Sequence, residues 1–254
     1  LLDDYRRSFG DAYEAVVRTI RQRGEFPTGR LAKSTVSIVE KLRRESIRLS
    51  QMQDIAGCRV VVGNVVDQEQ FVASLTTDFP ESSVMDRRDN PSYGYRAVHI
   101  IAEISGKAIE IQVRTSLQHL WAEVSEKSSD VLDSTIKHGG GPGWWRDSLT
   151  KISEWVAAYE KLEETLLTAY NELEKALLAA YHKLEKTVVT ELLEQDLPER
   201  MVQEMLAREK EEMQGKLTRE KEEIQGKLAH DWNEIADRLN EMISWLDCFK
   251  GQNQ

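Results

Sequence analysis

The run 108–115 alternates polar and apolar side chains. Glu110, Gln112 and Arg114 occupy every second position, and isoleucine or valine fills the positions between them. Because the side chains of a strand point alternately to its two faces, this spacing predicts a half-buried strand. One face of that strand would carry a carboxylate, an amide and a guanidinium, which are groups from which polar binding and catalytic sites are built.

The preceding run, 96–104, also has strand composition, and Ser105-Gly106 is a two-residue turn signal that predicts an antiparallel hairpin. A turn that pairs Ile104 with Lys107 fixes the other pairs: His99 opposite Gln112, Ile101 opposite Glu110, and Ala97 opposite Arg114. An imidazole would then join the polar face. The alternative is an ordinary amphipathic hairpin whose polar face is only solvated.

Several other segments in the first half of the chain carry unusual groupings of polar residues at short spacings. Together with the strand they form five motifs in order: Lys33-Ser34-x-x-Ser37-Ile38-x-x-Lys41-Leu42, Asp54-Ile55-Ala56-Gly57-Cys58-Arg59, Gly94-Tyr95-Arg96-Ala97-Val98-His99, Glu110-x-Gln112-x-Arg114-Thr115 and Gln118-His119-x-x-Ala122-Glu123.

With these five motifs, residues from about Arg30 to Glu126 resemble the synthetase domain of the RelA/SpoT family. The enzymes of this family move pyrophosphate from ATP to a ribose 3′-hydroxyl. The resemblance implies an ATP-dependent pyrophosphokinase with a nucleotidyltransferase-like α+β domain.

Composition agrees with a globular domain plus an extension. The chain has 254 residues, of which 40% are hydrophobic and 31% charged, and it begins at Leu1 without a methionine. It lacks an apolar run of membrane-spanning length and a visible secretory signal. Its two cysteines, Cys58 and Cys248, lack both a disulfide framework and metal-ligand spacing. We therefore expect a cytoplasmic protein without a membrane partner.

The net charge of −10 is unevenly distributed. Residues 1–60 contain 12 basic and 8 acidic side chains, whereas residues 158–254 contain 13 basic and 22 acidic ones. A basic first segment suits nucleotide phosphates, and the acidic charge belongs to an appendage.

The spacing of apolar residues, together with glycine and proline, predicts an α+β domain over residues 1–157 with a small mixed sheet flanked by helices. The loop 137–143 is too rich in glycine for regular structure. The predicted elements are helices at 5–23, 34–49, 67–78 and 116–132 and strands at 58–62, 84–86, 96–104 and 108–115.

Residues 158–254 form a second region with an eleven-residue repeat. Segments starting at Ala158, Ala169 and Ala180 resemble one another, and 208–217 recurs as 219–228. Eleven residues make three helical turns with little supercoiling, so the repeat predicts long helices, and Asp196-Leu197-Pro198 predicts the turn between them. The expected product is an all-α helical hairpin or coiled coil.

This second region also contains His230-Asp231, a pair used for metal binding in the hydrolase half of long RelA/SpoT enzymes. Here the pair lies in an apolar helical stripe without further ligands, so we expect no hydrolase site.

A basic face is predicted on the helix that starts near Ser34. Lys33, Ser37, Lys41, Arg44 and Arg48 follow one another at spacings of three or four. We expect Arg44 and Arg48 to be merely solvated. Lys33, Ser37 and Lys41 coincide with the family pattern, which implies contact with ATP.

The resemblance also assigns Arg30 and Arg59 to the adenine of ATP, with guanidinium planes as stacking surfaces. Arg59 stands five residues after Asp54, as in the family. Arg30 stands three residues before Lys33 instead of the usual two, so its position is displaced or its loop is longer.

Asp54 and Glu110 are the carboxylates that the resemblance assigns to Mg²⁺ and to catalysis. Hard oxygen ligands suit Mg²⁺, which commonly takes one or two protein carboxylates and completes its shell with phosphate and water. Glu110 is also the implied base for the attacking hydroxyl. All activity therefore depends on these two side chains meeting at one site.

On the acceptor side, the resemblance implies that Tyr95 stacks on the acceptor base and that His99, Gln112, Arg114 and Glu123 line the site. We expect His119 to support or pack beside these residues.

The identity of the acceptor stays open. Guanine-nucleotide synthetases commonly carry a lysine and an asparagine just before the Gly-Tyr pair, whereas this chain reads Asn90-Pro91-Ser92-Tyr93-Gly94-Tyr95. The segments 51–59 and 118–123 look more like the toxic branch of the small alarmone synthetases. Members of that branch can pyrophosphorylate the 3′ CCA end of tRNA and so block translation.

Three hypotheses follow. The first is a toxin-like enzyme acting on tRNA, with Arg87, Arg88 and arginines of the first helix as a phosphate-binding rim. The second is an alarmone synthetase acting on GDP or GTP. The third is an inactive scaffold whose helical tail recruits partners. The tail itself could restrain the catalytic face, as a fused antitoxin would, bind a separate antitoxin, or mediate self-association.

Overall fold

The structure, a computed structural model, describes residues 2–193 and 198–252. Contacts divide the chain into two compact units: residues 1–158 together with 236–254, and residues 159–235. The sequence suggested a division between residues 157 and 158, which stays a prediction. In the structure, the end of the chain groups with the first unit.

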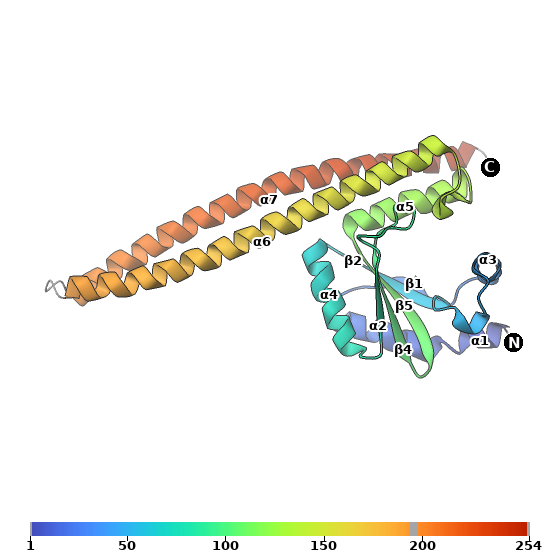
Figure 1. The fold of residues 1–254 in the computed structure, drawn as a ribbon, viewed down its shortest axis with the longest axis horizontal. Helices are drawn as coiled ribbons and strands as arrows, with labels where there is room; N and C mark the ends of the chain where they lie inside the picture. The colour runs from blue at the N-terminus through green and yellow to red at the C-terminus, as the bar shows by residue number, and fades with distance from the viewer. Residues whose placement is uncertain (1, 194–197, 253–254) are drawn as a thin grey trace. The chain divides into compact units, whose positions relative to one another are not determined.

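The first unit is built on a five-stranded mixed sheet in the order β1-β2-β5-β4-β3 (Figure 1). Strands β2 and β5 are parallel and the other neighbours are antiparallel. The expected small mixed sheet is thus confirmed. Its strands are β1 (Thr28–Arg30), β2 (Ala56–Val62), β3 (Ser83–Asp86), β4 (Val98–Ile104) and β5 (Lys107–Thr115).

The predicted hairpin register is confirmed between β4 and β5. Ile104 pairs with Lys107, and His99 lies opposite Gln112. Ser105 and Gly106 connect the strands with φ values of 51° and 70°, the left-handed pair that a two-residue type I′ turn requires.

The two faces of the sheet have different chemistry because the strand residues alternate. Cys58 and Val60 of β2 and Ile109 and Ile111 of β5 point into the hydrophobic core. The core is closed by residues from helices α2 and α4, such as Ile20. Positions between these apolar ones, including Glu110, belong to the opposite face.

Helices flank the sheet, as expected. In the first unit they are α1 (Leu2–Arg7), α2 (Gly10–Gln22), α3 (Thr35–Glu45), α4 (Val65–Asp78) and α5 (Ser116–Val131), with 3₁₀ turns η1 (Leu49–Gln51) and η2 (Ile136–His138).

Four details differ from the sequence-based expectation. The predicted first helix is two helices, and β1 was not predicted at all. Helix α3 ends at Glu45, because Ser46 adopts a left-handed φ of 52°, so Arg48 lies outside the helix. The loop 137–143 is partly regular, since η2 covers its start and α6 begins at Gly143.

The long helices α6 (Gly143–Leu193) and α7 (Glu199–Gln252) confirm the predicted helical extension. Residues 194–197, which hold most of the predicted Asp196-Leu197-Pro198 turn, lie outside the described residues. Within the described ranges, no helix is both long enough and apolar enough to cross a membrane.

In the second unit the eleven-residue repeat becomes a ladder of tyrosines. Each tyrosine is at least 92% buried and donates its hydroxyl to a backbone carbonyl of α7. The pairs are Tyr159 with Leu228, Tyr170 with Leu217, and Tyr181 with Leu206. Because both partners step by eleven residues in opposite directions, the ladder fixes the antiparallel register of the two helices.

Candidate active site

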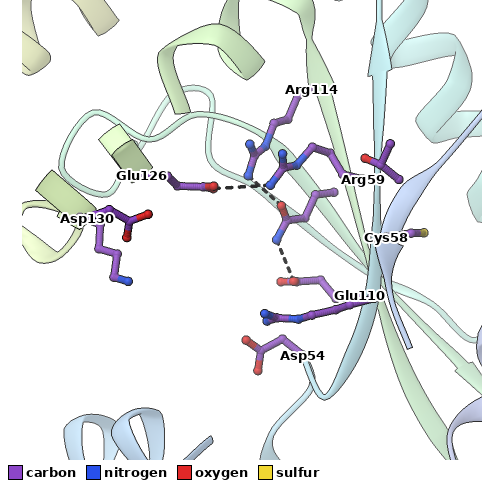
Figure 2. Close-up of a pocket in the computed structure, with 13 residues that line it drawn as sticks. Asp54, Cys58, Arg59, Glu110, Arg114, Glu126 and Asp130 are labelled. Atoms are coloured by element: carbon purple, nitrogen blue, oxygen red, sulfur yellow. Dashed lines mark hydrogen bonds and ion pairs between the residues drawn. The ribbon is translucent and has the colours of Figure 1, made fainter. Parts of the chain in front are cut away.

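A cavity of about 460 Å³ opens on the polar face of the sheet (Figure 2). Strands β1, β2 and β5 supply most of its wall, and the segment before β2, helix α5 and η2 supply the rest. It is lined by Thr28, Gly29, Arg30, Asp54, Gly57, Cys58, Arg59, Glu110, Gln112, Arg114, Glu126, Asp130 and Lys137.

Asp54 and Glu110 line this same cavity, although 56 positions separate them in the sequence. Asp54 stands just before β2, and Gly57 of β2 pairs with Glu110 of β5 in the parallel register. The absence of a side chain at Gly57 leaves room beside Glu110. The two carboxylates that the sequence proposed as partners therefore meet at one site.

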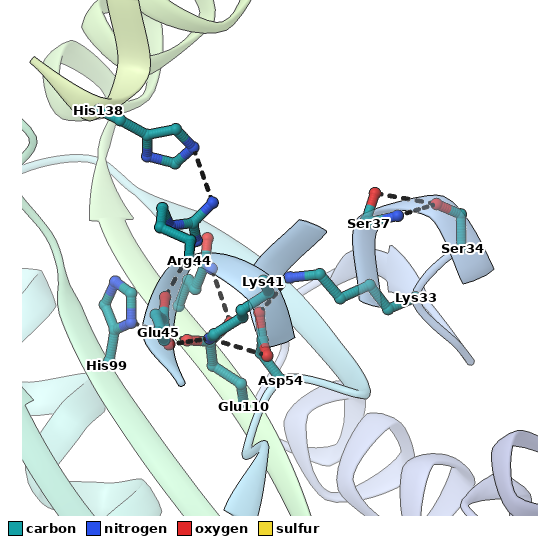
Figure 3. Close-up of polar contacts among 11 residues, drawn as sticks. Lys33, Ser34, Ser37, Lys41, Arg44, Glu45, Asp54, His99, Glu110 and His138 are labelled. Carbon is teal, nitrogen blue, oxygen red and sulfur yellow. Dashed lines mark hydrogen bonds and ion pairs between the residues drawn. The ribbon is translucent and has the colours of Figure 1, made fainter. Parts of the chain in front are cut away.

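Asp54 is held by two lysines (Figure 3). Lys33 Nζ lies 2.5 Å from Asp54 Oδ2, and Lys41 Nζ lies 3.0 Å from Oδ1. Burial acts to raise the pKa of Asp54, but the two ammonium groups hold that pKa below its ordinary value. The carboxyl group is therefore ionised at neutral pH.

The first turn of α3 supplies hydrogen-bond donors close to Lys33. Ser34 caps the helix, and its Oγ accepts a hydrogen bond from the Ser37 backbone N–H at 3.1 Å. The Ser34 hydroxyl also donates to Ser37 Oγ at 2.9 Å. A helix N-terminus beside a lysine is a favourable place for phosphate groups.

Glu110 accepts a hydrogen bond on each carboxylate oxygen. His99 Nδ1 lies 2.9 Å from Oε1, and Gln112 Nε2 donates to Oε2 at 2.8 Å. Burial acts to raise the pKa of Glu110, and the negative charge of Asp54 does the same, but the bonds from His99 and Gln112 bring it below its ordinary value.

Arg30 and Arg59 both lie on the cavity wall, from strands β1 and β2. Arg59 Nη2 lies 3.5 Å from Glu126 Oε1. Burial and the positive charge of Arg114 lower the pKa of Arg59. The neighbouring guanidinium groups of Arg59 and Arg114 mark this part of the wall as a place for an anionic or aromatic ligand.

Other predicted residues lie outside the cavity wall. Lys33 and Lys41 reach the site through Asp54, and Tyr95 and His99 reach it through hydrogen bonds to cavity residues.

Glu123 Oε1 lies 3.7 Å from His119 Nε2, and neither residue lines the cavity. Arg44 is exposed and contacts Glu45 and His138. His230 and Asp231 are exposed on α7, with side-chain exposures of 79% and 60%.

Seven cavity residues were not proposed from the sequence: Thr28, Gly29, Gly57, Cys58, Glu126, Asp130 and Lys137. Glu126 and Asp130 follow Glu123 at three and seven residues, so helical spacing could have placed all three on one side of α5. Thr28 and Gly29 were missed because the three-residue strand β1 has no periodic pattern.

Comparison with known proteins supports the resemblance to the RelA/SpoT family. A family model described as the region found in RelA / SpoT proteins matches residues 29–129, which confirms the resemblance for that region. The GTP pyrophosphokinase YjbM of Bacillus subtilis is 37% identical over 115 residues, which are 39% of this chain and 54% of that protein.

An uncharacterized protein of Mycobacterium tuberculosis is 35% identical over 115 residues, 44% of this chain and 42% of that protein. The chain thus spans about half the length of the curated relatives that it matches. The small alarmone synthetase 2 of Bacillus subtilis superposes with a TM-score of 0.51 and 24% identity, covering 67% of this chain and 98% of that one. That likeness shows the fold alone.

Proposed function

We propose that this chain, whose residues 29–129 form a RelA/SpoT-type region, is a pyrophosphokinase that moves the β,γ-pyrophosphate of ATP to a ribose 3′-hydroxyl. One observation carries the proposal: Asp54 and Glu110 line a single cavity with cationic groups around them. The name of the 37% identical relative, a GTP pyrophosphokinase, supports the same reaction.

In the proposed reaction the acceptor 3′-oxygen attacks the β-phosphorus of ATP. The bond between that phosphorus and the oxygen bridging to the α-phosphorus breaks, and AMP leaves. Glu110 takes the proton of the hydroxyl. Lys33, Lys41 and the first turn of α3 bind phosphate oxygens, and Arg30 and Arg59 hold the adenine.

The donor set fits Mg²⁺. Two carboxylates face one cavity, and Asp54 is close enough for its charge to raise the pKa of Glu110. Asp54 and Glu110 would hold the ion, with phosphate oxygens completing its shell. Bound there, Mg²⁺ would neutralise charge that develops on the phosphates.

A guanine nucleotide, GDP or GTP, is the acceptor that the contacts favour. In the rim expected to bind tRNA, the charge of Arg88 is compensated by Asp86 at 2.7 Å and Glu69 at 3.3 Å, and the Arg87 side chain is engaged by Ser92. A small nucleotide needs only the cavity and the ring of Tyr95.

The 3′ end of tRNA is the second candidate, and a sequence observation favours it. The segment 90–95 lacks the lysine and asparagine that guanine-nucleotide synthetases commonly carry before the Gly-Tyr pair. In that case the protein would act as a toxin that blocks translation.

Purified protein incubated with γ-labelled ATP, Mg²⁺ and either GDP, GTP or tRNA tests both candidates. We expect AMP release and label in a guanosine tetra- or pentaphosphate. Label found only in tRNA would select the second acceptor. The absence of AMP release with every acceptor would overturn the proposed activity and favour the scaffold hypothesis.

A further inference from the structure

Five side chains on the polar face of the sheet form a closed ring of hydrogen bonds. Two arms connect Arg114 with Glu110, and Figure 2 shows the shorter one. In the shorter arm, Arg114 Nη2 donates to Gln112 Oε1 at 2.8 Å, and Gln112 Nε2 donates to Glu110 Oε2 at 2.8 Å.

The longer arm passes through an aromatic pair. Arg114 Nη2 donates to the Tyr95 hydroxyl at 3.0 Å, that hydroxyl lies 2.9 Å from His99 Nε2, and His99 Nδ1 lies 2.9 Å from Glu110 Oε1. The rings of Tyr95 and His99 meet edge to face, with centroids 5.6 Å apart.

Which group donates each hydrogen bond follows from the two residues at which the arms meet, Arg114 and Glu110. Arginine can only donate and an ionised carboxylate can only accept, so His99 must carry a proton on Nδ1. With the Nδ1–H tautomer, Nε2 is the acceptor, and it takes the hydrogen of the Tyr95 hydroxyl. Both hydrogens of Arg114 Nη2 are used, one in each arm.

Arg114 is a rigid starting point for both arms. Its residue is 2% exposed, and its guanidinium carbon lies 5.0 Å from the centroid of the Tyr95 ring. Burial on β5 leaves this side chain little freedom, so it can define where Gln112 and Tyr95 stand.

We propose that this ring is a positioning device for the catalytic base: Arg114, Tyr95, Gln112 and His99 together fix the orientation of the Glu110 carboxylate toward the acceptor hydroxyl. His99 is then a positioning residue that acts through Glu110, instead of an acceptor contact as the sequence suggested. The proposal rests on the proposed function for the role of Glu110, and extends it to the side chains behind it.

The ring also limits how Tyr95 can bind a substrate. Arg114 covers one side of its aromatic ring, and its hydroxyl is engaged with His99. An acceptor base that stacks on Tyr95 would therefore have to use the side away from Arg114. The ring of Tyr95 would therefore serve substrate binding, while its hydroxyl serves the orientation of Glu110.

Tyr95→Phe separates these two roles, because it keeps the aromatic ring and removes only the hydroxyl. We expect kcat to fall about tenfold, while KM for the acceptor stays within about twofold. Tyr93→Phe is the matched control, since Tyr93 is 60% exposed, two residues away, and outside the ring. An unchanged kcat in Tyr95→Phe would overturn the proposal.

Substitutions of His99 supply a rescue test. The amide of asparagine can stand near the position of Nδ1 and donate to Glu110, whereas the amide of glutamine stands near Nε2. We expect His99→Ala and His99→Gln to lose about 10- to 100-fold in kcat and His99→Asn to recover part of the loss. If these variants raise KM for the acceptor at unchanged kcat, His99 touches substrate and the proposal is wrong.

A readout without turnover separates this proposal from the proposed function. The nitrogen NMR signals of His99, assigned with His99→Asn among five histidines, should show a proton on Nδ1 in the wild type and a changed Nε2 signal in Tyr95→Phe. An imidazole protonated only on Nε2 would overturn the ring even in a protein that released no AMP.

Discussion

Gly57 on β2 lies directly opposite Glu110 on β5, and a Cβ added at position 57 would stand 2.8 Å from the Glu110 carbonyl oxygen. That separation is shorter than carbon–oxygen contacts allow, and the atom that it meets is backbone. Glycine is therefore required for β2 and β5 to approach each other beside Glu110, the proposed catalytic carboxylate.

Gly57→Ala should both destabilise the first unit and impair catalysis. Overpacking of this kind costs about 1–3 kcal/mol, because the strands must separate to admit the methyl group. Denaturant unfolding measures the loss of stability, and AMP release measures activity.

Gly215→Ala is the matched control for this change. Gly215 lies within helix α7 with nothing within 4 Å of an added Cβ, so alanine there should stabilise the helix by about 0.5–1 kcal/mol. If Gly57→Ala were as stable as the wild type, the close approach of the two strands would be wrong.

Asp54→Asn should abolish turnover while the protein stays folded. The change removes a carboxylate that we propose as an oxygen ligand for Mg²⁺, and it leaves Lys33 and Lys41 without their partner. Loss of the metal contribution corresponds to several kcal/mol, or at least about a hundredfold in rate. AMP release measures the effect, and circular dichroism monitors folding.

Asp89→Asn makes the same change of charge at an exposed position and should leave turnover unchanged. A variant of Asp54 that retained full activity at low Mg²⁺ would show that this carboxylate does not contribute to the reaction.

The hairpin register could be predicted because a single turn signal at Ser105-Gly106 fixes the pairing of every residue along two strands. The meeting of Asp54 with Glu110 could not be derived from spacing, because it depends on the parallel pairing of β2 with β5. The family resemblance supplied that link.

A left-handed residue explains the early end of one predicted helix. Helix α3 stops at a left-handed Ser46, a conformation that no residue pattern announces, and so Arg48 leaves the predicted basic face. The polar face itself was predicted as four groups near one another. The closed ring of hydrogen bonds depends on the burial of Arg114. Arginines are rarely buried, so the sequence gives no sign of this position.

Cys58 should be inert toward thiol reagents, because its side chain is buried in the hydrophobic core, although the residue belongs to the strand that lines the cavity. Burial, aided by the charge of Glu110, raises the pKa of its thiol to about 12, so the reactive thiolate is scarce at about pH 8. Iodoacetamide should modify Cys248, which is exposed, and leave both Cys58 and turnover unchanged. Mass spectrometry of the digested protein distinguishes the two sites, and rapid labelling of Cys58 in folded protein would contradict its burial.

Removing one repeat from each long helix should shorten the hairpin without changing its register. Deletion of residues 170–180 and 207–217 takes eleven residues from each side and brings Tyr181 and Leu206 into the places of Tyr170 and Leu217. Because eleven residues complete three turns, the apolar stripe stays continuous.

We expect unchanged AMP release, since residues 159–235 form a compact unit of their own and each repeat contacts its neighbours. Size-exclusion chromatography with light scattering tests self-association in the same sample. A rise in turnover after the deletion would instead identify the helical extension as a restraint on the catalytic face, as expected of a fused antitoxin.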